Sequence, residues 1–76
     1  MKTLLRQTGS RIMRLRERRG ISQVALARSA GIARATLVRV EQGATAATLS
    51  VLAQIARVLR VEVRDLLPTT KTRRRR

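Results

Sequence analysis

The most informative absences from this 76-residue sequence are cysteine, histidine and every aromatic residue. Without cysteine the chain has neither a disulfide framework nor a thiolate zinc site. Without histidine it lacks the side chain that most often performs acid–base catalysis near neutral pH. Apolar residues still make up 43% of the chain, which is above the disordered range, so we expect one small domain with an aliphatic core.

Acidic residues are almost as scarce. The four acids are scattered and show no paired-carboxylate or metal-ligand spacing: they are Glu17, Glu41, Glu62 and Asp65. The sequence also contains no glycine-rich phosphate loop. We therefore expect no enzymatic activity, no metal site and no cofactor.

Long apolar runs are missing as well, and no stretch is long enough to cross a membrane. The opening MKTLLRQTG has too short an apolar segment for a signal peptide. These two observations predict a cytoplasmic protein with no membrane partner.

Positive charge is what the chain has in excess, because 18 lysines and arginines give it a net charge of +14. Five of these cations lie in residues 71–76, which leaves +9 on residues 1–70, so the domain itself is basic. This charge favours a polyanionic partner such as DNA. An acidic membrane surface is the competing partner, but the aromatic anchors that it would require are missing.

Residues 31–43, GIARATLVRVEQG, carry the most specific pattern in the chain. We expect a helix in which Ala33, Leu37 and Val40 share one apolar face. The opposite face mixes long polar side chains with small apolar ones, namely Arg34, Ala35, Val38, Arg39 and Gln42. Arginine can bond guanine in a bidentate fashion and alanine or valine can touch a thymine methyl, so we predict that this helix lies in the major groove of DNA. The alternative is an ordinary amphipathic helix with a basic surface.

Two helices are expected before this segment. Residues 4–19 repeat their apolar positions at helical spacing, although Gly9 lowers the helix propensity, so the firm part should begin near that glycine. Ser22 is a good N-cap for a short helix over residues 23–30. A helix, a turn containing Gly31 and a second helix form the helix-turn-helix pattern.

A further helix is expected over residues 49–59, capped by Thr48 or Thr45. Its expected core stripe consists of Leu49, Leu52, Ile55, Ala56 and Leu59. Val51 and Val58 lie seven residues apart on a second apolar face of the same helix. One apolar stripe is enough to pack a helix against a globular core. The second stripe therefore indicates a surface that binds a partner.

The segment SQVALARSAGIARATLVRVEQG resembles the phage-repressor/Cro (XRE-type) helix-turn-helix DNA-binding family, and the resemblance extends over residues 9–67. The positions that carry it include Arg16, Gly20, Ile21, Ser22, Gln23, Leu26, Ala27, Gly31, Ile32, Thr36, Leu37, Val40, Glu41 and Gly43. The resemblance implies an all-α fold, a compact five-helix bundle like the DNA-binding domain of lambda repressor, with a short fifth helix over residues 61–67. It divides the chain into an N-terminal extension or start of helix 1 (1–8), a DNA-binding domain (9–67) and a basic disordered tail (68–76).

The resemblance also implies roles for individual residues. It implies a partly buried structural ion pair between Arg16 and Glu41. Base contacts would fall to Arg34, Ala35, Val38 and Arg39, and the alternative for the two arginines is a solvated or phosphate-only role. Backbone contacts would fall to Ser22, Gln23, Thr36 and Gln42. Ser22 could equally be only a cap, and Thr36 could simply pack. Together with the second apolar face, the resemblance implies a dimer interface at Val51, Val58, Val61, Val63 and Leu67.

Three departures from the family pattern concern helix ends. Val24 and Ala25 stand where acids often follow the capping serine, and Ala33 stands where a serine or threonine commonly caps the DNA-reading helix. Arg60 stands where a glycine frequently ends the fourth helix. A left-handed backbone at Arg60 would be strained by about 1 kcal/mol.

The pattern as a whole predicts a sequence-specific DNA-binding transcriptional regulator, a repressor that binds palindromic half-sites about 34 Å apart as a homodimer. Its partner would be double-stranded DNA, which would hold it at the nucleoid. One alternative is an antitoxin, which would also bind a protein toxin. The others are a restriction–modification controller protein and a protein that compacts nucleic acid without sequence preference.

Overall fold

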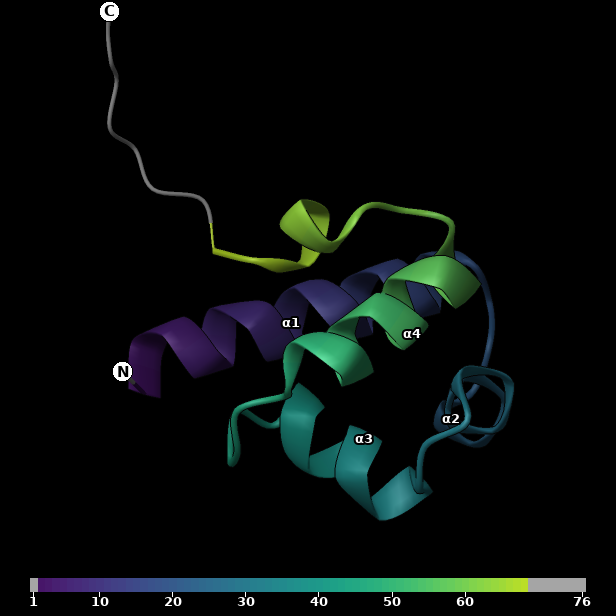
Figure 1. The fold of residues 1–76 in the computed structure, drawn as a ribbon, viewed down its shortest axis with the longest axis horizontal. Helices are drawn as coiled ribbons and strands as arrows, with labels where there is room; N and C mark the ends of the chain where they lie inside the picture. The colour runs from purple at the N-terminus through teal and green to yellow at the C-terminus, as the bar shows by residue number, and fades with distance from the viewer. Residues whose placement is uncertain (1, 69–76) are drawn as a thin grey trace, which may run out of the picture.

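The computed structural model of the chain describes residues 2–68. Figure 1 shows helices joined by loops, with no β-strand in this part of the chain. The elements are α1 (Lys2–Arg18), α2 (Gln23–Ala30), α3 (Arg34–Glu41), α4 (Leu49–Leu59) and the 3₁₀ helix η1 (Val63–Leu66). The predicted all-α class is therefore confirmed. The tail predicted to be disordered lies, apart from Pro68, outside the described residues.

Helix α1 begins earlier than expected, at Lys2 instead of near Gly9. Gly9 lies buried inside the helix, and a Cβ at this position would overlap the carbonyl oxygens of Val40 and Glu41 at the end of α3. The helix continues through the glycine because its packing against α3 offsets a propensity cost of only about 1 kcal/mol. Of the two alternatives for this segment, an extension or the start of helix 1, residues 2–8 follow the second, because they lie within α1.

Helices α2 and α3 form the predicted helix-turn-helix. Ser22 caps α2, since its side-chain oxygen accepts a hydrogen bond of 3.0 Å from the backbone N–H of Ala25. Gly31 ends α2 in the left-handed conformation with a φ of 73°. The apolar spacing wrongly placed Ala33 on the core face of α3, whereas the family pattern correctly placed it at the capping position. Ala33 is the exposed N-cap in an extended conformation, so the helix starts only at the next residue.

Helix α4 is capped by Thr48, whose side chain accepts a bond of 3.1 Å from the N–H of Val51. The predicted core stripe is correct for Leu52, Ile55, Ala56 and Leu59, which are buried. It is wrong for Leu49, which is 72% exposed. Leu49 is the first residue of the helix, one turn before Leu52, and the core does not extend that far.

The expected fifth α-helix is instead the four-residue 3₁₀ helix η1, so the bundle has four α-helices among residues 2–68. The backbone N–H of Glu62 donates to Asp65 Oδ2 at 2.9 Å and starts this turn. The 3₁₀ helix ends at Leu66, and the next residue, Leu67, is extended because Pro68 disfavours a helical conformation in the residue before it. The single turn still places Leu66 fully inside the core.

All five elements contribute to one aliphatic core. Its fully buried large side chains are Ile12, Leu26, Leu37, Ile55, Leu59 and Leu66. Two charged residues, Arg16 and Glu41, are buried beside it. Within residues 2–68 no helix is both long and apolar enough to span a bilayer. The core therefore serves to hold the short α2 and α3 in place on α1 and α4, because neither eight-residue helix would be stable alone.

Candidate nucleic-acid interface

Helix α3 divides cleanly into a buried and an outward side. Leu37, Val40 and Glu41 are buried. The side that faces away from the core carries exposed Arg34, Ala35, Arg39 and Gln42, with Thr36 and Val38 half-buried between the two sides. Figure 1 shows α3 along the lower edge of the molecule, below α4. The residues predicted to read bases thus reach the surface together on one short helix.

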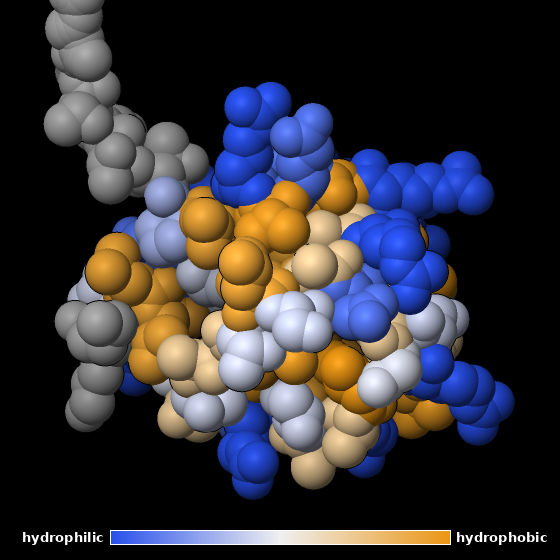
Figure 2. All heavy atoms as spheres, viewed as in Figure 1, coloured by the Kyte–Doolittle hydropathy of each residue, from blue (hydrophilic) through white to orange (hydrophobic). Residues whose placement is uncertain are grey.

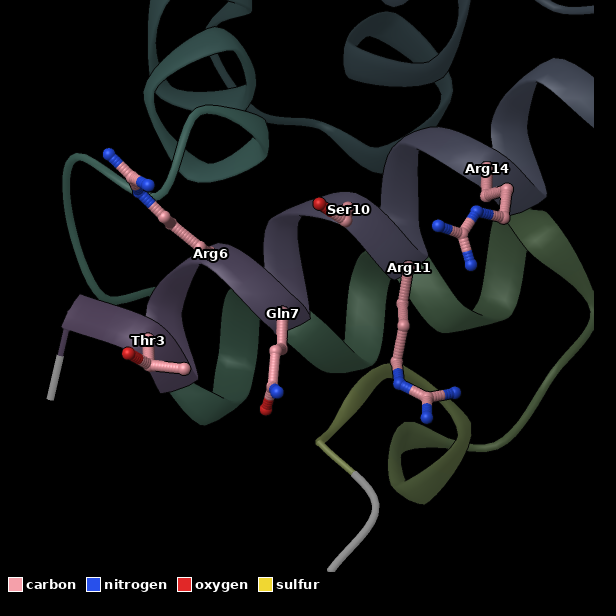
Figure 3. A pocket seen from close by; sticks show the side chains of 6 residues that line it. All are labelled: Thr3, Arg6, Gln7, Ser10, Arg11 and Arg14. Atoms are coloured by element: carbon pink, nitrogen blue, oxygen red, sulfur yellow. The ribbon is translucent and has the colours of Figure 1, made fainter.

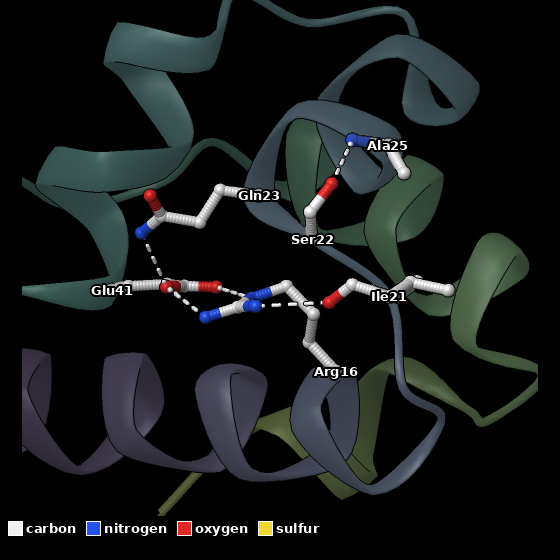
Figure 4. A network of polar contacts seen from close by, with 6 residues as sticks. All are labelled: Arg16, Ile21, Ser22, Gln23, Ala25 and Glu41. Atoms are coloured by element: carbon white, nitrogen blue, oxygen red, sulfur yellow. Dashed lines mark hydrogen bonds and ion pairs between the residues drawn. The ribbon is translucent and has the colours of Figure 1, made fainter.

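A buried polar network joins the elements that surround this helix (Figure 4). Arg16 Nε donates to Glu41 Oε2 at 2.7 Å and Arg16 Nη2 donates to Glu41 Oε1 at 3.2 Å, so the predicted ion pair is present and bidentate. A third donor, Gln23 Nε2, reaches Glu41 Oε1 at 2.9 Å. Arg16 Nη1 also donates to the carbonyl oxygen of Ile21 at 3.0 Å.

The network fixes how α2 and α3 sit relative to each other. The hydrogen bond to Glu41 raises the pKa of Arg16 above its ordinary value, and the negative charge of Glu41 acts in the same direction against the cost of burial. Burial therefore leaves Arg16 charged, and the network links the end of α1, the start of α2 and the end of α3. A ligand that contacts the start of α2 and the outer side of α3 at the same time requires this fixed spacing between them.

Gln23 has a role that the sequence reasoning missed. We expected it to contact DNA phosphate, and the structure places its amide on Glu41. An amide nitrogen carries two hydrogens and this bond uses one of them, so a phosphate contact is still available. Ser22 is in a similar position, because its oxygen caps α2 while its own hydroxyl proton can be donated elsewhere.

Arg19 directly follows the last residue of α1. Its side chain is exposed, and Nε donates to the carbonyl oxygen of Leu59 at 2.9 Å. That carbonyl belongs to the last turn of α4, where a cation satisfies an acceptor left without an intrahelical partner. The only sequence signal for this bond is a cation just beyond the end of a helix, which says nothing about its distant acceptor.

The residues predicted to form a dimer interface lie at the C-terminal half of the domain. Val51, Val58, Val61 and Val63 are half-buried and pack against the core, while Leu67 is 41% exposed. Figure 2 shows apolar side chains gathered over α4 and the segment that follows it, in the same view as Figure 1. This apolar surface is separate from the outer side of α3.

Solved structures with the same fold include three bacterial proteins. The restriction-modification controller protein C.AhdI from Aeromonas hydrophila is 33% identical, with a TM-score of 0.80, and the match covers 83% of this chain and 96% of that one. An HTH_3 family transcriptional regulator from Vibrio cholerae is 28% identical with a TM-score of 0.80, and the match covers 86% of this chain but only 36% of the regulator. The clp gene regulator ClgR from Corynebacterium glutamicum is 25% identical with a TM-score of 0.76, over 83% of this chain and 68% of that one.

Comparison with curated protein sequences gives no match. The helix-turn-helix family HTH_3, by contrast, matches residues 12–66, which include α2, α3 and the network that joins them. The matched range, the observed helix order and the 33% identity to a protein of nearly the same length agree with one another. The chain therefore belongs to the XRE-type helix-turn-helix family HTH_3.

Proposed function

We propose that this protein is a transcriptional regulator that binds double-stranded DNA in a sequence-specific manner, with α3 in the major groove. The observation that carries the proposal is the outward side of α3. It exposes Arg34, Ala35 and Arg39 on a helix whose other side is locked into the core by Leu37 and Glu41. A rigid helix with cations and small apolar groups on its free side suits the edges of base pairs.

The side chains on this surface divide into two classes of contact. The guanidinium groups of Arg34 and Arg39 fork onto guanine, while Ala35 and Val38 touch thymine methyl groups. Contacts to phosphate set the register and come from Ser22, Gln23, Thr36 and Gln42. The exposure of α3 and the position of the α2 N-terminus beside it support this division.

The charge of the chain supports DNA as the partner. With a net charge of +14 the protein attracts a polyanion and displaces its counterions. If a bound dimer neutralises roughly six to ten phosphates, its affinity falls about 10³–10⁵-fold between 50 and 200 mM salt.

The proposed regulator is a repressor that binds a palindromic operator as a homodimer. Two copies would place their α3 helices in successive major grooves about 34 Å apart. The apolar surface of Val51, Val58, Val61, Val63 and Leu67 supplies the contact between them. Its half-buried valines and exposed leucine support this assignment.

A restriction–modification controller is the second candidate. It is favoured by the 33% identity to C.AhdI, a protein bearing that description, and by the 96% of that chain that the match covers. Transcription in vitro from a template carrying the bound sequence separates the two candidates. A pure repressor only lowers the transcript level as its concentration rises, whereas a restriction–modification controller would activate as well as repress.

Selection of bound duplexes from random-sequence DNA tests the proposed function. The full chain is incubated with the library at 150 mM salt, and bound duplexes are recovered and sequenced through several rounds. We expect enrichment of an inverted repeat. Recovery of an unchanged, random library would leave only a nonspecific nucleic-acid-compacting role and would overturn the proposal.

A further inference from the structure

The loop that leaves α3, residues 42–48, contains no charged residue. Figure 1 shows this loop at one end of α3 and α2 at the other. A helix lying in the major groove is flanked by the two phosphate strands. In the proposed complex, the start of α2 therefore faces one strand, and the loop faces the other without a cation of its own.

Helix α1 brings a cation to this loop. Gly43 has a φ of 72°, and a Cβ at this position would lie 2.8 Å from Arg6 Cγ and 2.9 Å from Arg6 Cα. Gly9, one turn further along α1, packs in the same way on the last carbonyls of α3. Two glycines thus allow the first half of α1 to sit directly on the end of α3 and its loop, which fixes the backbone of Arg6 there.

The side chain of Arg6 projects toward the loop, whereas those of Gln7 and Arg11 point to the opposite side of α1 (Figure 3). The Arg6 side chain is exposed and makes no hydrogen bond or ion pair within residues 2–68. Arg6 lines an open groove of about 460 Å³ on the outer surface of α1. Arg14 lines the same groove about two turns further along the helix, away from the loop.

We propose that Arg6 binds a DNA phosphate beside the α3–α4 loop and supplies the cation that the loop lacks. This assignment rests on the proposed DNA-binding function. A guanidinium can bond two oxygens of one phosphate, and its backbone is already held in place by Gly43. The second phosphate strand is then contacted from α1, a helix outside the helix-turn-helix itself.

Arg6→Gln tests the proposal, with Arg14→Gln as the matched control on the same helix. Both variants lose one exposed arginine, so they change the net charge equally. Affinity for the selected duplex is measured from 50 to 200 mM salt. Loss of one phosphate contact makes the negative slope of log K against log salt less steep by about 0.9 per protomer. We expect this loss for Arg6→Gln and a slope near that of the unmodified protein for Arg14→Gln.

Ethylation interference on the same duplex locates the contact. In the unmodified protein, ethylation of one phosphate per half-site, next to the α3–α4 loop, blocks binding. In Arg6→Gln that position becomes insensitive, while it stays sensitive in Arg14→Gln. Equal slopes and identical interference patterns for the two variants would overturn the Arg6 assignment alone. Failure of the unmodified protein to prefer any duplex would instead overturn the proposed function together with it.

Discussion

At the scale of single residues, Glu41 is the side chain at which the buried polar network meets. It is buried at the end of α3, and its two oxygens accept three hydrogen bonds, two from Arg16 and one from Gln23. The sequence pattern predicted the pair with Arg16 because both residues stand at matching family positions. It did not predict Gln23 as a third member, since a surface glutamine and a network glutamine look alike in a sequence.

Glu41→Ala should destabilise the domain by about 3 kcal/mol, because it leaves the Arg16 guanidinium buried without its counterion. That is a large share of the ~5 kcal/mol expected for a domain of this size. Thermal melting followed by circular dichroism measures the loss, since the chain has no aromatic residue for fluorescence.

The control for Glu41→Ala is Arg64→Ala, which removes an exposed ion pair of 3.2 Å with Glu62. Both partners of that pair are largely in water, so we expect a change of only about 0–1 kcal/mol. An unchanged melting temperature for Glu41→Ala would mean that the buried pair contributes nothing to stability.

Substitution of Arg60 should raise the stability of the domain, in contrast to Glu41→Ala. It ends α4 with a φ of 59°, the only positive φ outside glycine in residues 2–68, as its position in the family pattern led us to expect. Arg60→Gly should stabilise the domain by about 0.5–1 kcal/mol, because glycine adopts this conformation without a Cβ penalty.

Arg57→Gly in the last turn of the same helix serves as the control for Arg60→Gly. Residue 57 is inside α4, so glycine there should cost about 1 kcal/mol in helix propensity. If both glycine substitutions lowered the melting temperature in circular dichroism, strain at Arg60 would not be a source of instability.

At the scale of elements, the sequence predicted the order of helices better than their ends. Spacing of apolar residues and the capping Ser22 and Thr48 located α2 and α4 correctly, because these signals are local. The start of α1 was predicted too late, since the contact of Gly9 with α3 is between residues far apart in sequence. The one-turn η1 was taken for an α-helix because four residues carry too little periodicity to separate the two.

Gly9→Ala separates local propensity from packing. Alanine favours a helix by about 1 kcal/mol over glycine, yet its Cβ would meet the carbonyls of Val40 and Glu41. We expect a net destabilisation of about 1–3 kcal/mol, as for overpacking in a core. Gln7→Ala, at an exposed position on the same helix, should change stability by less than about 0.5 kcal/mol. A stabilised Gly9→Ala protein would show that α1 and α3 are not in close contact.

At the scale of the whole molecule, the basic α3 surface and the apolar surface around α4 and η1 are separate. The residues proposed for base contact could be chosen from the sequence because the outward side of a short amphipathic helix follows from its periodicity. Arg34, Ala35 and Arg39 are exposed as expected, whereas Val38 is half-buried. The phosphate contact proposed for Arg6 could not be predicted from the sequence. No local sequence signal connects Arg6 with Gly43, which lies 37 positions later. Neither the proposed base contacts nor the proposed Arg6 contact uses the apolar surface. That surface is therefore available to bind a second copy of the chain.

Leu67→Glu tests the proposed dimer. Leu67 is 41% exposed, so the substitution spares the core but would bury an unpaired charge between two copies. We expect a dimer dissociation constant raised about ten- to hundredfold, measured by sedimentation equilibrium with interference optics. Leu49→Glu, at a leucine 72% exposed and outside the proposed interface, should leave the mass unchanged. Equal masses for both variants and the unmodified protein would place the contact elsewhere or show a monomer.

The central claim is that the outer side of α3 reads bases, and Arg39→Ala tests it most directly. Affinity is measured at fixed salt on the selected duplex and on a scrambled duplex of the same composition, with Arg57→Ala, an exposed arginine of α4, as the charge-matched control. If Arg39 forks onto guanine, Arg39→Ala loses about 1–3 kcal/mol on the selected duplex and much less on the scrambled one. Arg57→Ala should lower both affinities slightly and equally. Loss of affinity by the same factor on both duplexes for Arg39→Ala would show that Arg39 touches only the backbone, and would contradict the placement of α3 in the groove.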